Sequence, residues 1–242
     1  VTPEQVFQFA VKYGTIAPGG ETLERDVVVH VTMDYLLYLP EGDRESSAGG
    51  LPLLLFLHGS GERGSEVALV KTHGPPRVIE AGTDLPLVVL APQCPAETSW
   101  HADSLMALVD DTILRHDLDT KRVYVTGLSM GGYGAWVLAA EYPERFAAVA
   151  PVCAPYASID PTRLRHTPVW CFHGAVDDVV PVDDSVRMVR RIRDAGGDVR
   201  FTVYPDAGHD AWTQTYDQPA LYEWLLTHSR SCTCTRQPVG GS

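Results

Sequence analysis

The residue pattern most able to do chemistry is Gly-x-Ser-x-Gly at 127–131, with Ser129 at its centre. An apolar, β-rich run ends at Thr126, and a helical pattern covers 131–142. Where a strand turns directly into a helix, side chains two positions before and after the tip have no room. The tip residue then takes a strained backbone conformation that exposes its hydroxyl. The helix N-terminus also favours negative charge that develops beside it. We therefore predict that Ser129 is a nucleophile and not an ordinary N-cap serine.

A serine hydroxyl attacks a carbonyl only when a base removes its proton. Of the nine histidines, His209 lies in a loop after the last predicted strand, from which its imidazole can reach back to Ser129. His58 and His173 each stand before a glycine at a strand end, and we expect them to brace loops through hydrogen bonds. We predict that His209 is the general base, and the alternative is a loop histidine without a catalytic role.

The carboxylate that orients such a base is expected after the preceding strand, so that the chain order is serine, acid, histidine. Two adjacent aspartates, Asp177 and Asp178, stand at that position, and only one of them can point at the base. We choose Asp177, with Asp178 as its solvated neighbour. Asp206 and Asp210 flank His209 and are the alternatives, although sequence neighbours rarely aim at the ring beside them.

A tetrahedral intermediate also needs two backbone N–H donors for its oxyanion. One is expected from the residue after the nucleophile, Met130. The other is expected from the glycine-rich loop 58–64, where the lack of side chains lets the backbone approach an anion closely. Ser60 is our choice, with Gly59 or Gly61 as alternatives. The loop lacks the Lys-Ser/Thr ending of a phosphate-binding P-loop.

The elements that must position these residues alternate between apolar runs and helical patterns, which is typical of a doubly wound α/β sheet. We expect about eight strands, six of them parallel, with a short helix ahead of the first. Ligands bind at the carboxyl ends of the strands in such sheets. The predicted strands are 26–31, 34–39, 51–57, 85–91, 122–126, 147–152, 169–172 and 199–204, and the later helices are about 75–81, 104–116, 131–142, 182–195 and 218–228.

Length and composition favour one globular domain, 1–230, followed by a loose tail, 231–242: the chain has 242 residues, of which 45% are apolar. A net charge of −12 disfavours nucleic-acid binding, because such a field repels phosphate. No apolar run has the length of a membrane span. The chain begins at Val1, which favours an exported protein, periplasmic or extracellular, from which a leader or an upstream domain has been removed.

Five cysteines cannot all pair within one chain. Cys171 lies in an apolar run and is expected to be a buried thiol, whereas a bridge between Cys232 and Cys234, or from either to Cys94 or Cys153, stays open. The chain has no C-x-x-C pair and no H-E-x-x-H motif, so we expect no zinc site. The chemistry above needs neither a metal nor an organic cofactor.

In five ordered motifs the chain resembles the α/β-hydrolase superfamily, and within it the carboxylesterase and "predicted peptidase" group related to polyhydroxybutyrate depolymerases and feruloyl esterases. The resemblance spans about 27–228 and implies a mostly parallel, eight-stranded twisted sheet with helices on both faces. It implies Ser129, Asp177 and His209 as a triad, and Ser60 with Met130 as an oxyanion hole. The motifs are 57–64, 91–95, 127–134, 173–181 and 208–209.

The resemblance also carries over Trp100 as a residue lining the acyl or alcohol pocket; covering the edge of the core is the equal alternative. In the dienelactone hydrolase relatives the nucleophile is a cysteine, so Ser129 argues against that activity. Only about 13 residues, 154–166, separate the sixth strand from Thr167. A large lid domain does not fit there, and the resulting open cleft favours short esters over long-chain lipids.

These observations predict a serine carboxylesterase that hydrolyses short-chain or small esters through an acyl-enzyme intermediate. The ester is a small molecule or is linked to a polysaccharide. A feruloyl or acetyl polysaccharide esterase and a small serine peptidase are the alternatives within the same chemistry. A non-catalytic binding module with a hydrolase fold is the alternative outside it.

Overall fold

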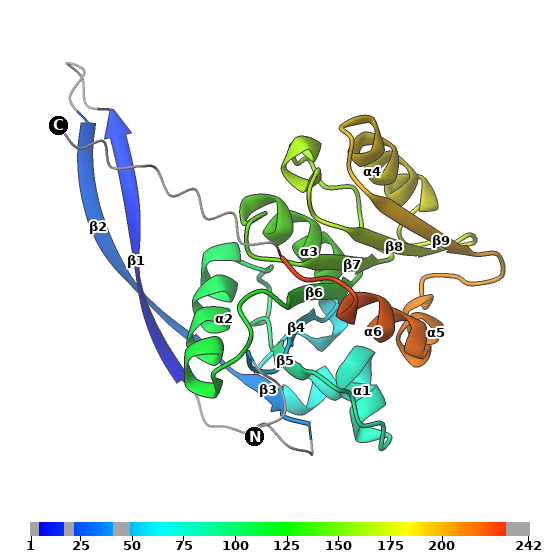
Figure 1. Cartoon of the computed structure of the whole chain (residues 1–242), viewed down its shortest axis with the longest axis horizontal. Coiled ribbons are helices and arrows are strands. Elements are labelled where there is room, and N and C mark those ends of the chain that lie inside the picture. The colour runs from blue at the N-terminus through cyan, green and yellow to red at the C-terminus, as the bar shows by residue number, and fades with distance from the viewer. Residues whose placement is uncertain (1–4, 17–21, 41–48, 231–242) are drawn as a thin grey trace.

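The computed structural model describes residues 5–16, 22–40 and 49–230, which form a seven-stranded sheet and a separate two-stranded hairpin (Figure 1). The strand order in the sheet is β3-β5-β4-β6-β7-β8-β9. The edge strand β3 (Tyr35–Tyr38) pairs antiparallel with β5. Six parallel strands follow, as predicted: β4 (Leu53–Leu57), β5 (Val88–Pro92), β6 (Val123–Leu128), β7 (Ala148–Val152), β8 (Val169–Gly174) and β9 (Val199–Tyr204).

The predicted short helix near the N-terminus is wrong, because β1 (Gln5–Ile16) occupies this part of the chain. It forms an antiparallel hairpin with β2 (Thr22–Met33), and β2 contains the predicted strand 26–31. That strand therefore belongs to the hairpin, and the main sheet has seven strands instead of eight. The strand period is visible in the sequence, since apolar residues recur at every second position: Phe7, Phe9, Val11 and Tyr13.

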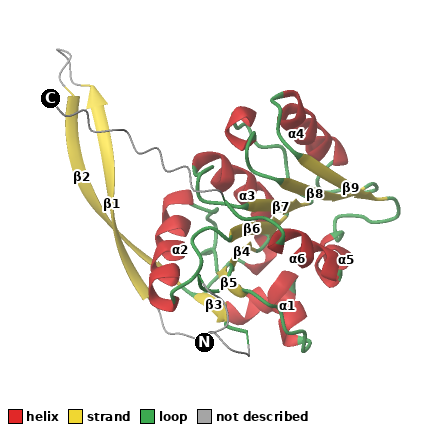
Figure 2. Cartoon of the chain, in the orientation of Figure 1, coloured by secondary structure: helices red, strands yellow, loops and turns green. Residues whose placement is uncertain are grey.

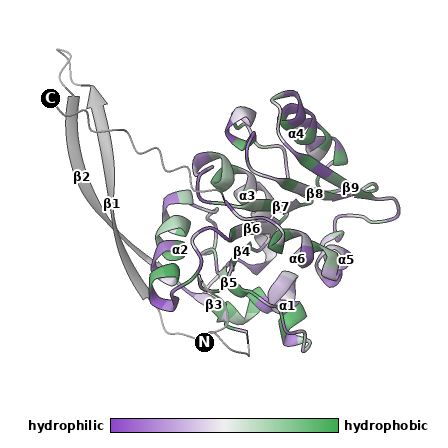
Figure 3. Ribbon diagram, viewed as in Figure 1, coloured by the Kyte–Doolittle hydropathy of each residue, from purple (hydrophilic) through white to green (hydrophobic). Residues whose placement is uncertain are grey.

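Helices cover both faces of the sheet, as predicted (Figure 2). Alternate residues of β4 point into two separate hydrophobic cores: Leu53, Leu55 and Leu57 into one, Leu54 and Phe56 into the other. β4 is accordingly apolar along its whole length, and the neighbouring strands are mostly apolar (Figure 3). The first core is closed by α2 (Ala102–His116), α3 (Met130–Glu141) and α4 (Val182–Asp194), the second by α1 (Gly74–Glu80), α5 (Trp212–Asp217) and α6 (Pro219–Leu226).

The predicted helix 218–228 corresponds to α6, and a second helix, α5, precedes it without having been predicted. Pro219 separates the two, because proline lacks an N–H and disfavours a helical conformation of the residue before it. Gln218 is accordingly extended, with φ −87° and ψ 125°. With six residues, α5 is too short to give a helical period in the sequence.

The connection from β7 to β8, residues 153–168, holds one short 3-10 helix, η4 (Pro161–Leu164), so the described residues contain no lid domain at this position. None of the helices in the described ranges combines the length and apolar content needed to cross a bilayer. Cys94, Cys153 and Cys171 are buried free thiols, which confirms the prediction for Cys171. The predicted tail 231–242, with its two cysteines, lies outside the described residues.

Candidate active site

Ser129 stands at the sharp turn between β6 and α3, and its backbone has the strained conformation that the sequence predicted. Its φ of +52° and ψ of −117° fall in a region that L-residues rarely adopt, at a cost of about 1–3 kcal/mol. The two flanking glycines explain the tightness of the turn. A Cβ at Gly127 would lie 2.3 Å from the carbonyl oxygen of Gly131, and one at Gly131 would lie 1.9 Å from that of Leu57.

The structure brings Ser129, His209 and Asp177 into one hydrogen-bonded chain, although they follow three different strands. Nε2 of His209 lies 3.0 Å from Oγ of Ser129, and Nδ1 lies 2.7 Å from Oδ2 of Asp177. Because a carboxylate only accepts, Nδ1 carries the proton, and Nε2 is then free to accept the hydroxyl proton of Ser129.

The Asp177 carboxylate is buried and fully hydrogen-bonded. Its side chain has 0% exposure, and Oδ1 accepts the backbone N–H groups of Val179 at 3.0 Å and Val180 at 2.8 Å. Burial by itself raises the pKa of this carboxyl. The hydrogen bonds from His209 and from the two amides outweigh burial and hold the pKa below its ordinary value. The carboxylate is therefore charged at neutral pH and can fix the tautomer of His209.

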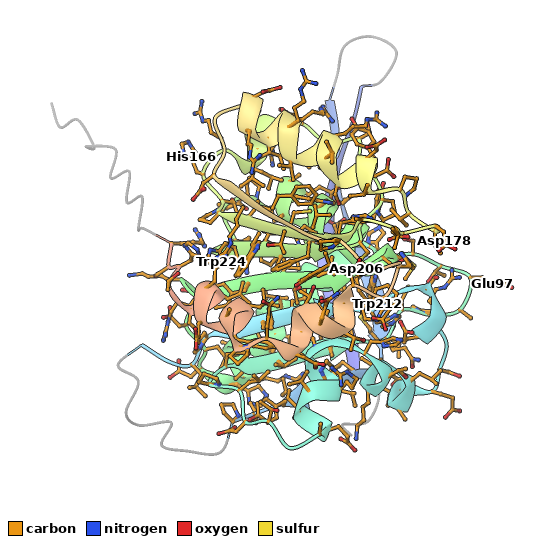
Figure 4. All side chains as sticks on the ribbon, turned by 90° about the vertical axis from the view of Figure 1, so that its right-hand side faces the viewer. Glu97, His166, Asp178, Asp206, Trp212 and Trp224 are labelled. Atoms are coloured by element: carbon orange, nitrogen blue, oxygen red, sulfur yellow. The ribbon has the colours of Figure 1, made fainter. Side chains whose placement is uncertain are left out.

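The three other candidate aspartates do not make this contact. Asp178 and Asp206 are exposed at the surface; in Figure 4 Asp206 faces the viewer and Asp178 lies at one side of the molecule. Asp210 instead accepts the backbone N–H of Thr213 at 3.1 Å and its hydroxyl at 3.0 Å. In the same view Asp178 and Glu97 lie on the side opposite His166, so the loops after β8 and β5 share one side of the molecule.

The two predicted oxyanion donors are backbone groups at the starts of helical turns. Ser60 begins the 3-10 helix η2 (Ser60–Glu62), and Met130 begins α3. Within the described part of the chain, neither amide N–H has a hydrogen-bond acceptor. The N–H of Gly59, by contrast, donates to Oε2 of the buried Glu62 at 2.9 Å, which argues against the Gly59 alternative. Gly61 stays open as the alternative to Ser60.

His58 braces this loop from the inside, as its position before Gly59 predicted. Its Nε2 accepts the backbone N–H of Cys94 at 2.9 Å, and its Nδ1 lies 2.6 Å from the carbonyl oxygen of Gly59. The ring is completely buried, and burial lowers the pKa of His58 to about 4. A neutral imidazole that links β5 to the start of the loop is therefore the stable form at neutral pH.

This neutral ring predicts a loss of stability in acid. The folded pKa of about 4 lies below the value of about 6.5 for an unfolded histidine, so the unfolded chain binds the extra proton. The contribution is fully present above about pH 6.5 and is lost as the pH falls toward about 4, amounting to about 3 kcal/mol. Urea unfolding at about pH 7 and about pH 4.5 measures most of this loss, and His58→Gln should lose about 2 kcal/mol less than the wild type. Equal losses in the two proteins would contradict the assignment.

Trp100 lies behind the same loop and packs against the first hydrophobic core. Its Nε1–H donates to the carbonyl oxygen of His58 at 3.2 Å, and the two rings meet edge to face with centroids 4.7 Å apart. A Cβ at Gly134 in α3 would lie 2.9 Å from the Trp100 ring. These contacts match the alternative in which Trp100 covers the edge of the core.

Three residues around the site were not predicted to take part in it. Glu62 holds the amide of Gly59, and the ring of Trp212 meets that of His209 edge to face at 5.0 Å. His173 lies 3.2 Å from the Asp177 carboxylate. Glu62 and His173 stand inside the motifs quoted above, but a motif does not say which atoms its members contact.

Cys153, His173 and Asp177 are grouped so that one donor atom of each lies within 4.8 Å of the others. Burial raises the pKa of the Cys153 thiol to about 12, so it is protonated at neutral pH. Both oxygens of Asp177 already accept hydrogen bonds. The group is therefore poorly suited to hold a cation without disrupting the hydrogen bond to His209.

The chain resembles several known proteins in sequence and in fold. The model of the dienelactone hydrolase family matches residues 95–223. A protein assigned as a carboxymethylenebutenolidase in Yersinia pestis is 34% identical over 104 residues, which are 39% of this chain and 39% of that protein. Poly(3-hydroxyalkanoate) depolymerase C of Paucimonas lemoignei is 46% identical over 54 residues, 22% of this chain and 13% of the depolymerase. The crystal structure of a thermostable esterase, 30% identical, has a TM-score of 0.70 and covers 91% of this chain and 63% of its own.

The chain spans 39% or less of the length of these two curated relatives. The structural match confirms the predicted α/β-hydrolase fold, and the depolymerase match confirms the predicted relation to that group of enzymes. The family match covers more than half of the 242 residues and includes Ser129, Asp177 and His209. This chain belongs to the dienelactone hydrolase family.

Proposed function

We propose that this protein is a serine carboxylesterase that hydrolyses short-chain or small carboxylic esters through an acyl-enzyme intermediate. The observation that carries the proposal is the continuous hydrogen-bonded chain from Ser129 Oγ through His209 to Asp177. The strained turn at Ser129 and the amides of Ser60 and Met130, which have no acceptor in the described part of the chain, support it further.

In the acylation step, Oγ of Ser129 attacks the ester carbonyl while its proton passes to Nε2 of His209. Asp177 stabilises the imidazolium that forms, and the amides of Ser60 and Met130 donate to the oxyanion of the tetrahedral intermediate. The imidazolium then gives its proton to the alkoxy oxygen as the carbon–oxygen bond breaks. The alcohol departs and leaves an ester on Ser129.

In the deacylation step, water takes the place of the alcohol. His209 accepts one proton of the water as its oxygen attacks the acyl carbonyl, and a second tetrahedral intermediate forms at the same amides. Its collapse returns the proton to Oγ of Ser129 and releases the carboxylic acid. The residues are then as they were at the start, so the cycle needs no further reactant.

The substrate class follows from the access to this edge of the sheet. The β7–β8 connection holds only η4, so the described residues place no lid domain there to bind a long acyl chain or to open at a lipid surface. Rates on p-nitrophenyl esters from two to sixteen carbons should therefore be highest for the short chains. Faster turnover of acetylated or feruloylated oligosaccharides would favour the polysaccharide esterase, and activity confined to chromogenic peptides would overturn the ester assignment.

The Ser60 donor can be tested because proline removes a backbone N–H. Ser60 is the first residue of η2, where proline fits, and Gly59 before it is extended, with ψ −175°. We expect Ser60→Pro to lower kcat about 10²–10³-fold with little change in the melting temperature. Ser60→Ala keeps the amide and should retain nearly full activity in the same ester assay.

Wild-type kcat in a folded Ser60→Pro variant would exclude the Ser60 amide as an oxyanion donor and leave Gly61 as the candidate. An equal loss in Ser60→Ala would instead assign the effect to the hydroxyl. Circular dichroism melting curves for both variants separate these results from misfolding.

A further inference from the structure

His173 is a second imidazole on the Asp177 carboxylate. It lies in β8, four residues before Asp177, and its ring has 0% exposure. Its Nε2 is 3.2 Å from Oδ2 of Asp177, the same oxygen that His209 approaches to 2.7 Å. One carboxylate oxygen therefore stands between two histidine rings.

The partners of the His173 ring determine where its proton sits. Nε2 lies 2.9 Å from the carbonyl oxygen of Val180, and a carbonyl can only accept, so Nε2 carries hydrogen. That N–H donates to the carbonyl oxygen of Val180, and Oδ2 of Asp177 lies beside it at 3.2 Å from Nε2, close enough for electrostatic contact with its positive edge. Nδ1 lies 2.7 Å from the hydroxyl of Ser185 in α4. That hydroxyl oxygen accepts a hydrogen bond from the thiol of Cys171 at 3.5 Å. The ring is thus held at both nitrogens.

We propose that His173 is a positioning residue of the proposed esterase reaction, which holds Oδ2 of Asp177 beneath His209 and draws part of its negative charge. This role rests on the proposed function, because it acts through the Asp177–His209 pair and does not touch the substrate. A carboxylate oxygen beside the partly positive N–H edge of a neutral imidazole is a weaker base toward its own hydrogen-bond donor. Without that contact the carboxylate would hold the imidazolium form of His209 more tightly, and the acid limb of kcat/KM would lie at higher pH.

The charges around His209 come from several elements. Asp177 contacts it, Asp210 is its neighbour in the chain, and the exposed carboxylates of Asp178 and Asp206 stand on nearby loops. His73 and His209 both meet the ring of Trp212 edge to face. The Cys153 thiol is uncharged at neutral pH. A substitution at His173 leaves all of these groups in place, so a change in the pH profile reports on the shared carboxylate.

Two substitutions at His173 separate its proton from its bulk. In His173→Gln the amide nitrogen can occupy the place of Nε2, whereas in His173→Asn the side chain reaches only the place of Nδ1. We expect His173→Asn to move the acid limb of kcat/KM up by about 0.5–1 pH unit, with kcat about tenfold lower at its plateau. His173→Gln should return both toward the wild type. Ser185→Ala, which removes the partner at the other nitrogen, should leave the acid limb in place.

A His173→Asn variant whose acid limb coincides with that of the wild type, while its melting temperature falls, would overturn the proposal and leave His173 a structural residue. The wild-type protein provides a test that does not depend on folding of a variant. Long-range ¹⁵N–¹H spectra of histidine-labelled protein report the tautomer of His173, and a proton on Nδ1 alone would place a lone pair against Asp177 and overturn the proposal. Covalent labelling of the wild type by a fluorophosphonate tests the proposed function itself, so the two failures are distinguishable.

Discussion

Replacing Ser129 with alanine should lower kcat for p-nitrophenyl acetate or butyrate about 10⁶-fold, because no other group in the proposed mechanism can form the acyl-enzyme. The backbone amides of Ser60 and Met130 stay in place, so a slow residual hydrolysis by water is expected. The fold should persist, since alanine has the same Cβ as serine and meets the same strain at a φ of +52°. Steady-state kinetics and labelling with a fluorophosphonate measure the loss directly.

A matched control is Ser158→Ala, which removes an exposed hydroxyl in the β7–β8 connection. It should keep wild-type kinetics and full labelling. Ester hydrolysis at an undiminished rate in Ser129→Ala would refute the proposed function, and labelling of that variant would place the reactive serine elsewhere in the chain.

Asp177→Asn should lower kcat about 10⁴-fold, a loss of the size found for the corresponding change in trypsin-like enzymes. The asparagine oxygen can still accept the amides of Val179 and Val180, which directs its NH₂ group toward His209. Two donors cannot bond to each other, so His209 must move its proton to Nε2 and can no longer accept one from Ser129. The same NH₂ group would also lie close to Nε2 of His173.

The neighbouring Asp178→Asn is the control, because it neutralises a carboxylate one residue away that is exposed to solvent. We expect it to change kcat less than threefold, within the range of surface substitutions far from a contact (about 0.5 kcal/mol). A large loss in Asp178→Asn together with a small one in Asp177→Asn would reverse the assignment of the acid. Melting temperatures of both variants exclude misfolding as the cause.

Several features of the site could be predicted because they depend on local backbone sterics. The turn at Ser129 leaves no space for a Cβ at Gly127 or Gly131, and this requirement is visible in the sequence as Gly-x-Ser-x-Gly. The apolar run of β4 is likewise visible, since a strand buried on both faces shows no alternation. The predicted helix boundaries were less exact near Pro219, which separates α5 from α6.

The N-terminal hairpin was predicted as a short helix followed by a strand, although the alternation of Phe7, Phe9, Val11 and Tyr13 has the period of a strand. A strand depends on a partner for its hydrogen bonds, and the partner of β1 lies across the turn in β2. The periodicity of a single segment does not reveal that pairing. For the same reason residues 26–31 were predicted as a strand of the main sheet instead of the hairpin.

The sequence by itself determined the nucleophile turn, the doubly wound sheet of six parallel strands and the short list of candidates for base, acid and oxyanion donors. Only the tertiary structure decided which candidates meet. Asp177, and not Asp178, contacts His209. The amide of Gly59 donates to Glu62 and is therefore not free to bind an oxyanion. His173 lies against Asp177. The physical reason is that strand and turn propensities act over a few residues. A hydrogen bond across 80 residues of chain, as between Ser129 and His209, depends on how the strands are ordered and in what register they pair.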